Sequence, residues 1–187
     1  MILGSHNSLS FLKPRKWWMR LIAFTARCQE KSIIKQYFDY GVRCFDIRVR
    51  FNKKGEPIIA HGIIEYDCNI DEYLSFFNAM GDCKVRLLHE ARNKKQYYPD
   101  LFRSFCIKVE SLYSNITFYH GKNLYNWETD YNFANNFSEE EVYASVCAPK
   151  LIDDWYPRLF AKKNNKRILK NGTDKDILLI DFVNYGY

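Results

Sequence analysis

A set of polar residues follows, or lies within, short apolar runs of this 187-residue sequence, and their side chains could perform acid–base and phosphate chemistry. One imidazole can take a proton from a nucleophile, a second can protonate a leaving oxygen, and a guanidinium can neutralise phosphate charge. The set therefore suits the cleavage of a phosphodiester. Its members are His6, Asp46, Arg48, His61, Glu90, His120 and Asp181.

Each member also has a purely structural interpretation. Asp46 and Arg48 lie two residues apart and could form an exposed ion pair on a strand with one face in water. A single histidine is usually a surface residue or a satisfied core residue, and Asp181 could simply begin a turn. The order and spacing of the whole set carry more information than any one member.

The elements that must position these residues alternate between short strands and helices, which is typical of one sheet covered by helices. The clearest strand is 43–51, where charged and apolar residues alternate and therefore lie on opposite faces. Residues 142–147 are ambiguous, and 122–137 is the expected long loop. The other predicted strands are 1–3, 57–60, 85–89, 116–119 and 177–180, and the predicted helices are 14–26, 32–40, 71–80, 99–113 and 155–167.

Parallel strands that curl into a barrel present their carboxyl ends at one mouth, where catalytic groups lie. The polar residues at the strand ends are therefore expected to converge there. The length fits one domain, 1–187. A content of 47% hydrophobic and 17% aromatic residues excludes a disordered chain.

The net charge of +6 is unevenly distributed. Segments 10–35 and 158–175 each hold seven basic residues against one acidic residue. Two basic patches favour an anionic partner, which could be a phosphate group, a lipid surface or a nucleic acid. We expect no nucleic-acid partner, because no binding motif accompanies the patches.

The six cysteines form no CxxC pair and no tight ladder, which indicates buried thiols in a reducing compartment rather than a zinc site or a disulfide scaffold. No apolar stretch approaches the roughly 20 residues that cross a bilayer. The first residues leave no room for a secretory leader before the first motif. We therefore expect a cytoplasmic protein that can contact a membrane peripherally.

Three motifs, GSHNS at 4–8, YGVRCFDIR at 40–48 and PIIAHG at 57–62, resemble in this order the X region of phosphatidylinositol-specific phospholipases C. The segment LLIDFVN at 178–184 is similar to the strand that supplies the last active-site Asp of the bacterial enzymes. The resemblance spans nearly the whole chain and is sparse between 91 and 176.

The resemblance implies a reduced or distorted TIM-type (β/α) barrel, since 187 residues are fewer than the roughly 250 of a typical TIM barrel. It also implies cleavage of an inositol phospholipid, or of a related soluble phosphodiester with a hydroxyl group, by internal hydroxyl attack. His6 would be the general base, oriented by Asp181, and His61 the general acid. Arg48 would hold the phosphate, with Asp46 beside it. The further substrate-binding candidates are Glu90, Asn7, His120 and Tyr156.

Arg48 is similar to the arginine of the metal-free relatives, so we expect no cofactor. Calcium is the alternative, with Asn7, Asp46 and Glu90 as its oxygen ligands. Metal-free relatives usually have Asp where this chain has Asn7. An amide cannot stabilise an imidazolium by charge, which weakens the expected basicity of His61.

Trp17 and Trp18 lie among basic residues, and relatives often have a membrane-touching helix at this point. They could insert at a headgroup layer, or they could pack against the barrel. Two other functions remain open. One is a catalytically weakened lipid- or phosphate-binding protein. The other is a glycerophosphodiester phosphodiesterase, although this sequence lacks the metal-binding carboxylate pairs expected of that enzyme. The sequence leaves the oligomeric state undetermined.

Overall fold

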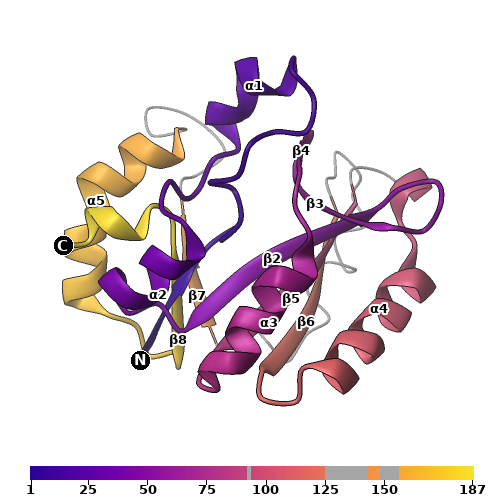
Figure 1. Cartoon of the computed structure of the whole chain (residues 1–187). Coiled ribbons are helices and arrows are strands. Elements are labelled where there is room, and N and C mark those ends of the chain that lie inside the picture. The colour runs from indigo at the N-terminus through magenta and orange to yellow at the C-terminus, as the bar shows by residue number, and fades with distance from the viewer. Residues whose placement is uncertain (92–93, 125–142, 148–155) are drawn as a thin grey trace.

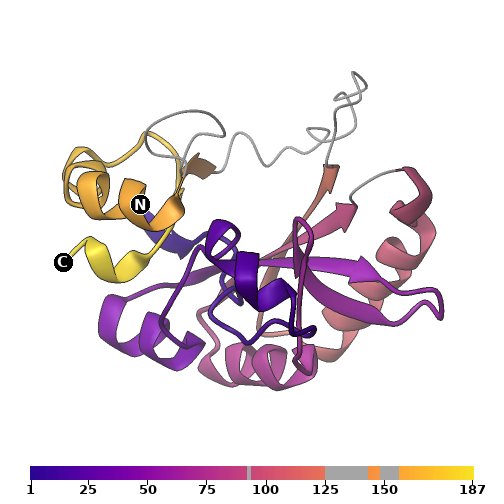
Figure 2. The same cartoon turned by 90° about the horizontal axis from the view of Figure 1, so that it is seen from above.

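The fold was analysed in a computed structural model that describes residues 1–91, 94–124, 143–147 and 156–187. Its centre is a curled sheet whose helices lie on the outer side, as Figure 1 and the view from above in Figure 2 show. Six strands of this sheet run parallel, in the spatial order β6, β5, β2, β1, β8 and β7. Their bounds are β1 Ile2–Ser5, β2 Cys44–Phe51, β5 Lys84–Ala91, β6 Thr117–Leu124, β7 Tyr143–Val146 and β8 Ile177–Ile180.

The architecture is a reduced TIM-type barrel, as the sequence predicted. Within the described residues, β6 and β7 each have one neighbour and form the two edges of the parallel part of the sheet. The longer helices are α2 Ile33–Tyr40, α3 Ile70–Met80, α4 Pro99–Leu112 and α5 Pro157–Asn171. Short helical turns are α1 Met19–Ile22, η1 Ala23–Thr25, η2 Lys94–Gln96 and η5 Val183–Tyr185. In the described part of the chain, no helix has the length and apolar character that crossing a membrane requires.

The central strand β2 explains why the sheet can hold charges. Its apolar residues, including Phe45, pack under the outer helices, where the Phe45 and Phe77 rings stack with centroids 4.4 Å apart. Asp46 and Arg48 alternate with them and point to the opposite, inner side of the sheet. All eight residues of β2 are buried. The half-wet strand considered from the sequence is therefore wrong, because the charged face is enclosed by the curl of the sheet.

A hairpin of β3 Pro57–His61 and β4 Ile64–Tyr66 departs from the expected all-parallel pattern. β3 runs antiparallel to the end of β2, with Ile59 opposite Val49. The turn between β2 and β3 therefore folds the chain back, and His61 returns to the level of the middle of β2. His61 reaches the inner face by this reversal and not at the carboxyl end of a parallel strand.

The predicted helix 14–26 is mostly wrong. Pro14 forms a β-bridge with Tyr66, and the Arg15 amide donates to the Glu65 carbonyl over 2.8 Å. These contacts hold the start of the segment extended, so only α1 and η1 are helical. Elsewhere the predicted ends are close: Ser32 caps α2, and Gly41 ends it in the left-handed conformation at φ 67°.

Two further boundaries differ because of contacts distant in sequence. The strand expected at 116–119 continues to Leu124, because β6 pairs with β5 over eight residues. The side chain of Asn69, and not Asp71, caps α3. Within the ambiguous stretch 142–147, residues 143–146 form β7, and residue 142 lies outside the described residues. Of the expected loop 122–137, the first three residues belong to β6 and the rest lies outside the described residues.

Candidate active site

His6 is the residue around which the inner-face groups gather. It follows β1, and Asp181 follows β8, and these two strands are paired with Ser5 opposite Ile180. The register therefore places the two residues side by side, and His6 Nδ1 lies 2.7 Å from Asp181 Oδ1. A carboxylate only accepts hydrogen bonds, so Nδ1 holds the proton and Nε2 of the neutral ring keeps its lone pair.

Arg48 donates a hydrogen bond to that lone pair. Its Nη2 lies 2.5 Å from His6 Nε2, its Nε donates to Asp46 Oδ2 over 3.1 Å, and its Nη1 donates to Glu90 Oε2 over 3.3 Å. A guanidinium can only donate, so the contact with His6 requires the neutral imidazole. The site is therefore arranged with His6 in the form of a base.

The two carboxylates that hold Arg48 are themselves fixed by backbone groups. Asp46 accepts from the Asn7 amide over 2.9 Å, and Glu90 accepts from the Gly62 amide over 2.8 Å. Burial opposes the charge on Asp46, but Arg48 and Arg86 outweigh it and hold the pKa of Asp46 well below its usual value. The guanidinium thus stands in a rigid anionic cradle.

His61 provides a second imidazole at the opposite side of the site. The His6 and His61 ring centroids are 5.9 Å apart, with the rings nearly perpendicular. His61 Nδ1 donates to the Ala26 carbonyl over 2.8 Å, which leaves Nε2 as the acceptor of the neutral ring. Burial, followed by the charge of Arg48, lowers the pKa of His61 to about 4.

Asn7 supports this carbonyl and not the imidazole directly. Its Nδ2 lies 3.4 Å from the same Ala26 oxygen, and its backbone takes the left-handed conformation at φ 45°. Its Oδ1 is buried without a hydrogen-bond partner among the described residues. No carboxylate therefore contacts His61 Nδ1, in contrast to the Asp181 contact of His6.

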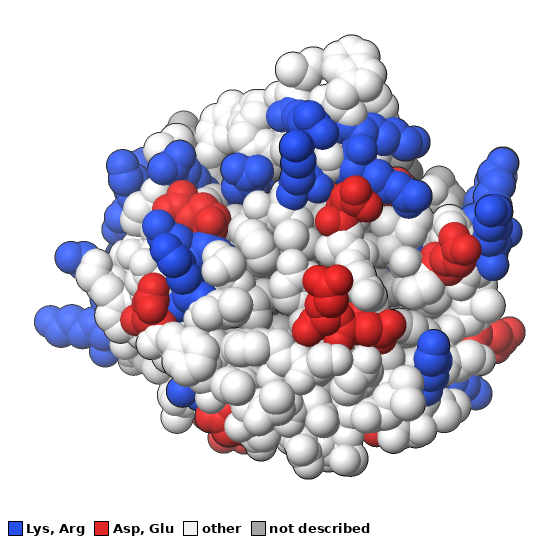
Figure 3. Space-filling view, viewed as in Figure 1, with Lys and Arg blue, Asp and Glu red and all other residues white. Residues whose placement is uncertain are grey.

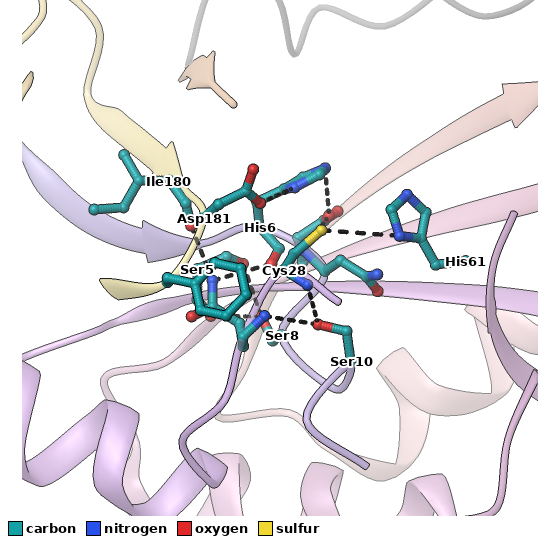
Figure 4. A network of polar contacts seen from close by, with 12 residues as sticks. Ser5, His6, Ser8, Ser10, Cys28, His61, Ile180 and Asp181 are labelled. Carbon is teal, nitrogen blue, oxygen red and sulfur yellow. Dashed lines mark hydrogen bonds and ion pairs between the residues drawn. The ribbon is translucent and has the colours of Figure 1, made fainter. Parts of the chain in front are cut away.

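His6 is the more basic of the two histidines. Burial lowers the pKa of His6, but the charge of the adjacent Asp181 carboxylate raises it, and the result lies well above the ordinary value of histidine. Figure 4 shows His6 between Asp181 and the Cys28 thiol, with His61 beyond that thiol. Burial raises the pKa of Cys28 to about 12, so this thiol is neutral at physiological pH.

Sequence reasoning missed several residues that hold the site together. Gln29 is fully buried, and its Nε2 donates to the backbone carbonyls of His6 over 3.1 Å and Ile180 over 2.9 Å. Arg50 donates to the Glu90 and Gly62 carbonyls and so ties the hairpin to β5. The thiol of Cys147 lies within 4.8 Å of His6 and Asp181 ligand atoms. The charge alternation in β2 could have indicated Arg50, whereas no local pattern marks Gln29 or Cys147.

The residues considered as calcium ligands do not fit that ion. Arg48 bridges Asp46 and Glu90, so a positive group already stands between the two carboxylates. The carboxylates also accept backbone amides, which are arranged for an anion and not for a cation. A calcium ion would have to displace the guanidinium from both carboxylates.

Some candidates lie away from this centre. His120 falls within β6, and its Nε2 pairs with Glu110 Oε1 of α4 over 3.0 Å, so it faces the outer helix layer. Tyr156 directly precedes α5, and its ring stacks on Phe24. Trp17 and Trp18 are exposed, at 73% and 40% of their surface, and therefore do not pack into the barrel.

No protein-family model matches this sequence, and no curated protein matches it. The fold is similar to solved structures of the phosphatidylinositol-specific phospholipase C from Staphylococcus aureus. A double mutant of that enzyme matches with a TM-score of 0.65 and 14% identity over 97% of this chain and 84% of that chain. A structure from a study of that enzyme's membrane binding matches with a TM-score of 0.60 and 13% identity over 97% and 85%. At this identity the similarity shows a shared phosphodiesterase-like fold.

Proposed function

We propose that this protein is a metal-independent phosphodiesterase that cleaves an inositol phospholipid, or a related phosphodiester with a neighbouring hydroxyl group, by internal attack. The arrangement of His6 carries the proposal. Its Nδ1 is fixed by Asp181, its Nε2 faces a phosphate-binding guanidinium, and a second imidazole lies 5.9 Å away. The shared fold with a phospholipase C supports this reaction class.

In the proposed reaction, His6 Nε2 takes the proton of the substrate hydroxyl, and the hydroxyl oxygen attacks phosphorus. The bond from phosphorus to the alcohol leaving group breaks, and His61 Nε2 gives its proton to the leaving oxygen. The products are an alcohol and a cyclic phosphodiester. Arg48 occupies His6 Nε2 in this structure, so the substrate phosphate must first draw the guanidinium onto its own oxygens.

The first prediction tests His6 as the base. We expect His6→Ala to lower turnover of phosphatidylinositol by about two to four orders of magnitude, because general-base catalysis is lost. The measurement is release of cyclic inositol phosphate in the presence of a chelator, with glycerophosphoinositol as the soluble comparison. His120→Ala is the matched control, because this histidine faces α4. Unchanged turnover in His6→Ala would exclude the proposed role.

A second candidate function is a phosphate- or lipid-binding protein with weakened catalysis. The low pKa of His61 and the neutral Asn7 favour it, since a general acid must hold its proton at the working pH. Vesicle binding with no product formation, unaffected by His6→Ala, would support this candidate over the enzyme.

We further propose that the substrate is met at a membrane surface. Residues 13–27, which we call the α1 segment, include five basic residues. The apolar side chains of Trp17, Trp18 and Leu21 are exposed among them. Figure 3 shows these Lys and Arg side chains gathered over that segment at the top of the view. Such a surface suits an anionic headgroup layer, where cations meet phosphate and aromatic rings insert.

A further inference from the structure

A cavity lies between α1 and η1 on one side and the start of α5 on the other. Its volume is about 330 Å³, and its lining includes Arg20, Phe24, Arg27, Glu30, Tyr156 and Arg158. None of the groups that surround His6 Nε2 belongs to this lining. The cavity is therefore a separate feature of the molecule.

The charge of the cavity is positive. Three guanidinium groups line it against the single carboxylate of Glu30. Arg158 pairs with Glu30 over 3.6 Å and donates from Nε to the Tyr185 hydroxyl over 2.8 Å, so its orientation is fixed. Arg27 Nε is buried and has no hydrogen-bond partner in the part of the chain that the structure describes. A buried donor without a partner costs free energy unless a ligand accepts from it.

An aromatic wall completes the cavity. The Phe24 and Tyr156 rings stack with centroids 5.6 Å apart and an angle of 29° between their planes. Guanidinium groups beside such a wall suit a ligand that has an anionic group joined to a carbon skeleton. A phosphate ester with a short polyol part meets both requirements.

The cavity shares its supporting segments with the catalytic centre. The Phe182 amide donates to the Cys28 carbonyl over 2.6 Å, and this bond joins the segment after β8 to the segment after η1. Cys28 and Asp181 face His6, whereas their neighbours Arg27 and Phe182 line the cavity. An occupant of the cavity would thus stand directly beside the catalytic mouth.

We propose that this cavity is a second anion site, which binds the phosphate of a phosphate ester such as a glycerophosphate or an anionic lipid headgroup. Arg27 donates from its buried Nε, and Arg20 and Arg158 neutralise the remaining charge. The ester part lies against Phe24 and Tyr156. The site is distinct from the Arg48 centre, so it binds an additional phosphate and does not replace the substrate.

Calorimetric titration with glycerol 1-phosphate tests the proposal without relying on turnover. We expect the pocket variant, Arg27→Gln with Arg158→Gln, to lose one binding event of the parent, or to weaken it about tenfold or more. The matched control, Lys166→Gln with Lys170→Gln, removes the same charge from exposed positions of α5 and should bind as the parent does. Equal numbers and affinities of binding events in the pocket variant and the control would overturn the proposal.

Two further measurements complete the test. If circular dichroism shows that the pocket variant does not fold, the same titration is made with Arg20→Gln. Arg20 is exposed, so its loss leaves the core intact. An unchanged affinity in Arg20→Gln would then overturn the site. Vesicles of phosphatidylglycerol and of phosphatidylcholine distinguish the two sources. A loss restricted to phosphatidylglycerol vesicles assigns a lipid headgroup, and a loss restricted to glycerol 1-phosphate assigns a soluble ester.

Discussion

His6 and His61 differ in the group that faces their Nδ1 atoms, which is the Asp181 carboxylate in one case and the Ala26 carbonyl oxygen in the other. The pKa of His6 is raised and that of His61 is lowered to about 4. The proposed reaction needs a neutral His6 and a charged His61. The Arg48 contact at Nε2 keeps His6 neutral in the structure, but the low pKa of His61 leaves that ring neutral as well at physiological pH, so the productive distribution of protons is a minority. A bound phosphate anion beside His61 would shift the proton toward it.

Asn7→Asp should correct this distribution. A carboxylate near the Ala26 carbonyl favours the charged form of His61, so we expect its pKa to rise by about one unit or more. The fraction of protonated His61 then increases at neutral pH, and turnover should increase with it. Aspartate tolerates the left-handed backbone of this position much as asparagine does.

The titration of the His61 ring by NMR, together with the pH profile of kcat/KM, measures this effect. Asn115→Asp is the control, because it adds the same charge at an exposed position. An unchanged His61 titration in Asn7→Asp would show that position 7 does not govern the second imidazole.

At the residue scale, the sequence predicted the convergence of four groups that lie in or beside the motifs. His6, Arg48, His61 and Asp181 meet in space although they are far apart in the chain. His120 does not join them. Gly121 suggested that the strand ends at His120, but β6 stays paired with β5 as far as Leu124, so His120 lies within the strand. Such pairing depends on a partner strand that no local pattern identifies.

Gln29 joins elements that local sequence cannot connect. Besides its bonds to the His6 and Ile180 carbonyls, its Oε1 accepts from the Val183 amide over 3.2 Å. It thus fixes the ends of β1 and β8, which His6 and Asp181 directly follow. Its segment, held by the Ser10 hydroxyl, has no helical or strand periodicity, so no local pattern indicates this role.

Gln29→Met should destabilise the fold and misplace the base. Three backbone groups each lose one hydrogen bond, although the Ile180 carbonyl keeps the bond from the His6 amide, so we expect the free energy of unfolding to fall by about 2 to 4 kcal/mol. We also expect kcat to fall more than KM rises, because His6 and Asp181 separate. Urea unfolding and steady-state kinetics measure the two effects.

Gln36→Met is the matched control for this element. Gln36 is equally buried and donates to the Ser8 and Lys31 carbonyls, but it does not touch the ends of β1 or β8. It should lower stability comparably and leave kcat closer to the parent value. Equal kcat losses in the two variants would reduce Gln29 to a purely structural role.

Prediction of the elements succeeded where caps and periodicity are local. Ser32 and Gly41 delimit α2 through their own backbone preferences, and the apolar run of β8 suits a strand buried on both faces. The helix expected at 14–26 failed because Pro14 and Arg15 pair with β4, a contact across about 50 residues. Propensity does not describe such competition from a distant strand.

The whole molecule reflects a limit set by chain length. The chain has too few residues for eight typical βα units, and its described residues form six parallel strands with a hairpin beside β2. Length and the resemblance together predicted the reduction. They did not predict the hairpin, since β3 and β4 are short runs whose direction depends on the turn between β2 and β3. The hairpin nevertheless carries His61, so this departure from a regular barrel positions one of the two imidazoles of the site.

At the same scale, one surface should govern how the molecule meets lipid. Trp17→Ala with Trp18→Ala removes exposed aromatic area from the α1 segment, and we expect affinity for phosphatidylinositol vesicles to fall about tenfold or more. Cleavage of glycerophosphoinositol should stay unchanged, because neither tryptophan contacts the groups around His6 in the described structure.

Ile107→Ala with Leu112→Ala provides the control, since these α4 side chains are exposed at 61% and 56% and lie outside both basic segments. Cosedimentation with vesicles measures binding in both variants. If apolar area alone governed binding, the two variants would lose affinity alike. A loss confined to the tryptophan variant would instead show that rings and cations act together, because the tryptophans lie within the basic segment 10–35 and the control residues do not. Equal losses would remove the α1 segment as the membrane contact, while the reaction proposed at His6 would stand on the soluble diester.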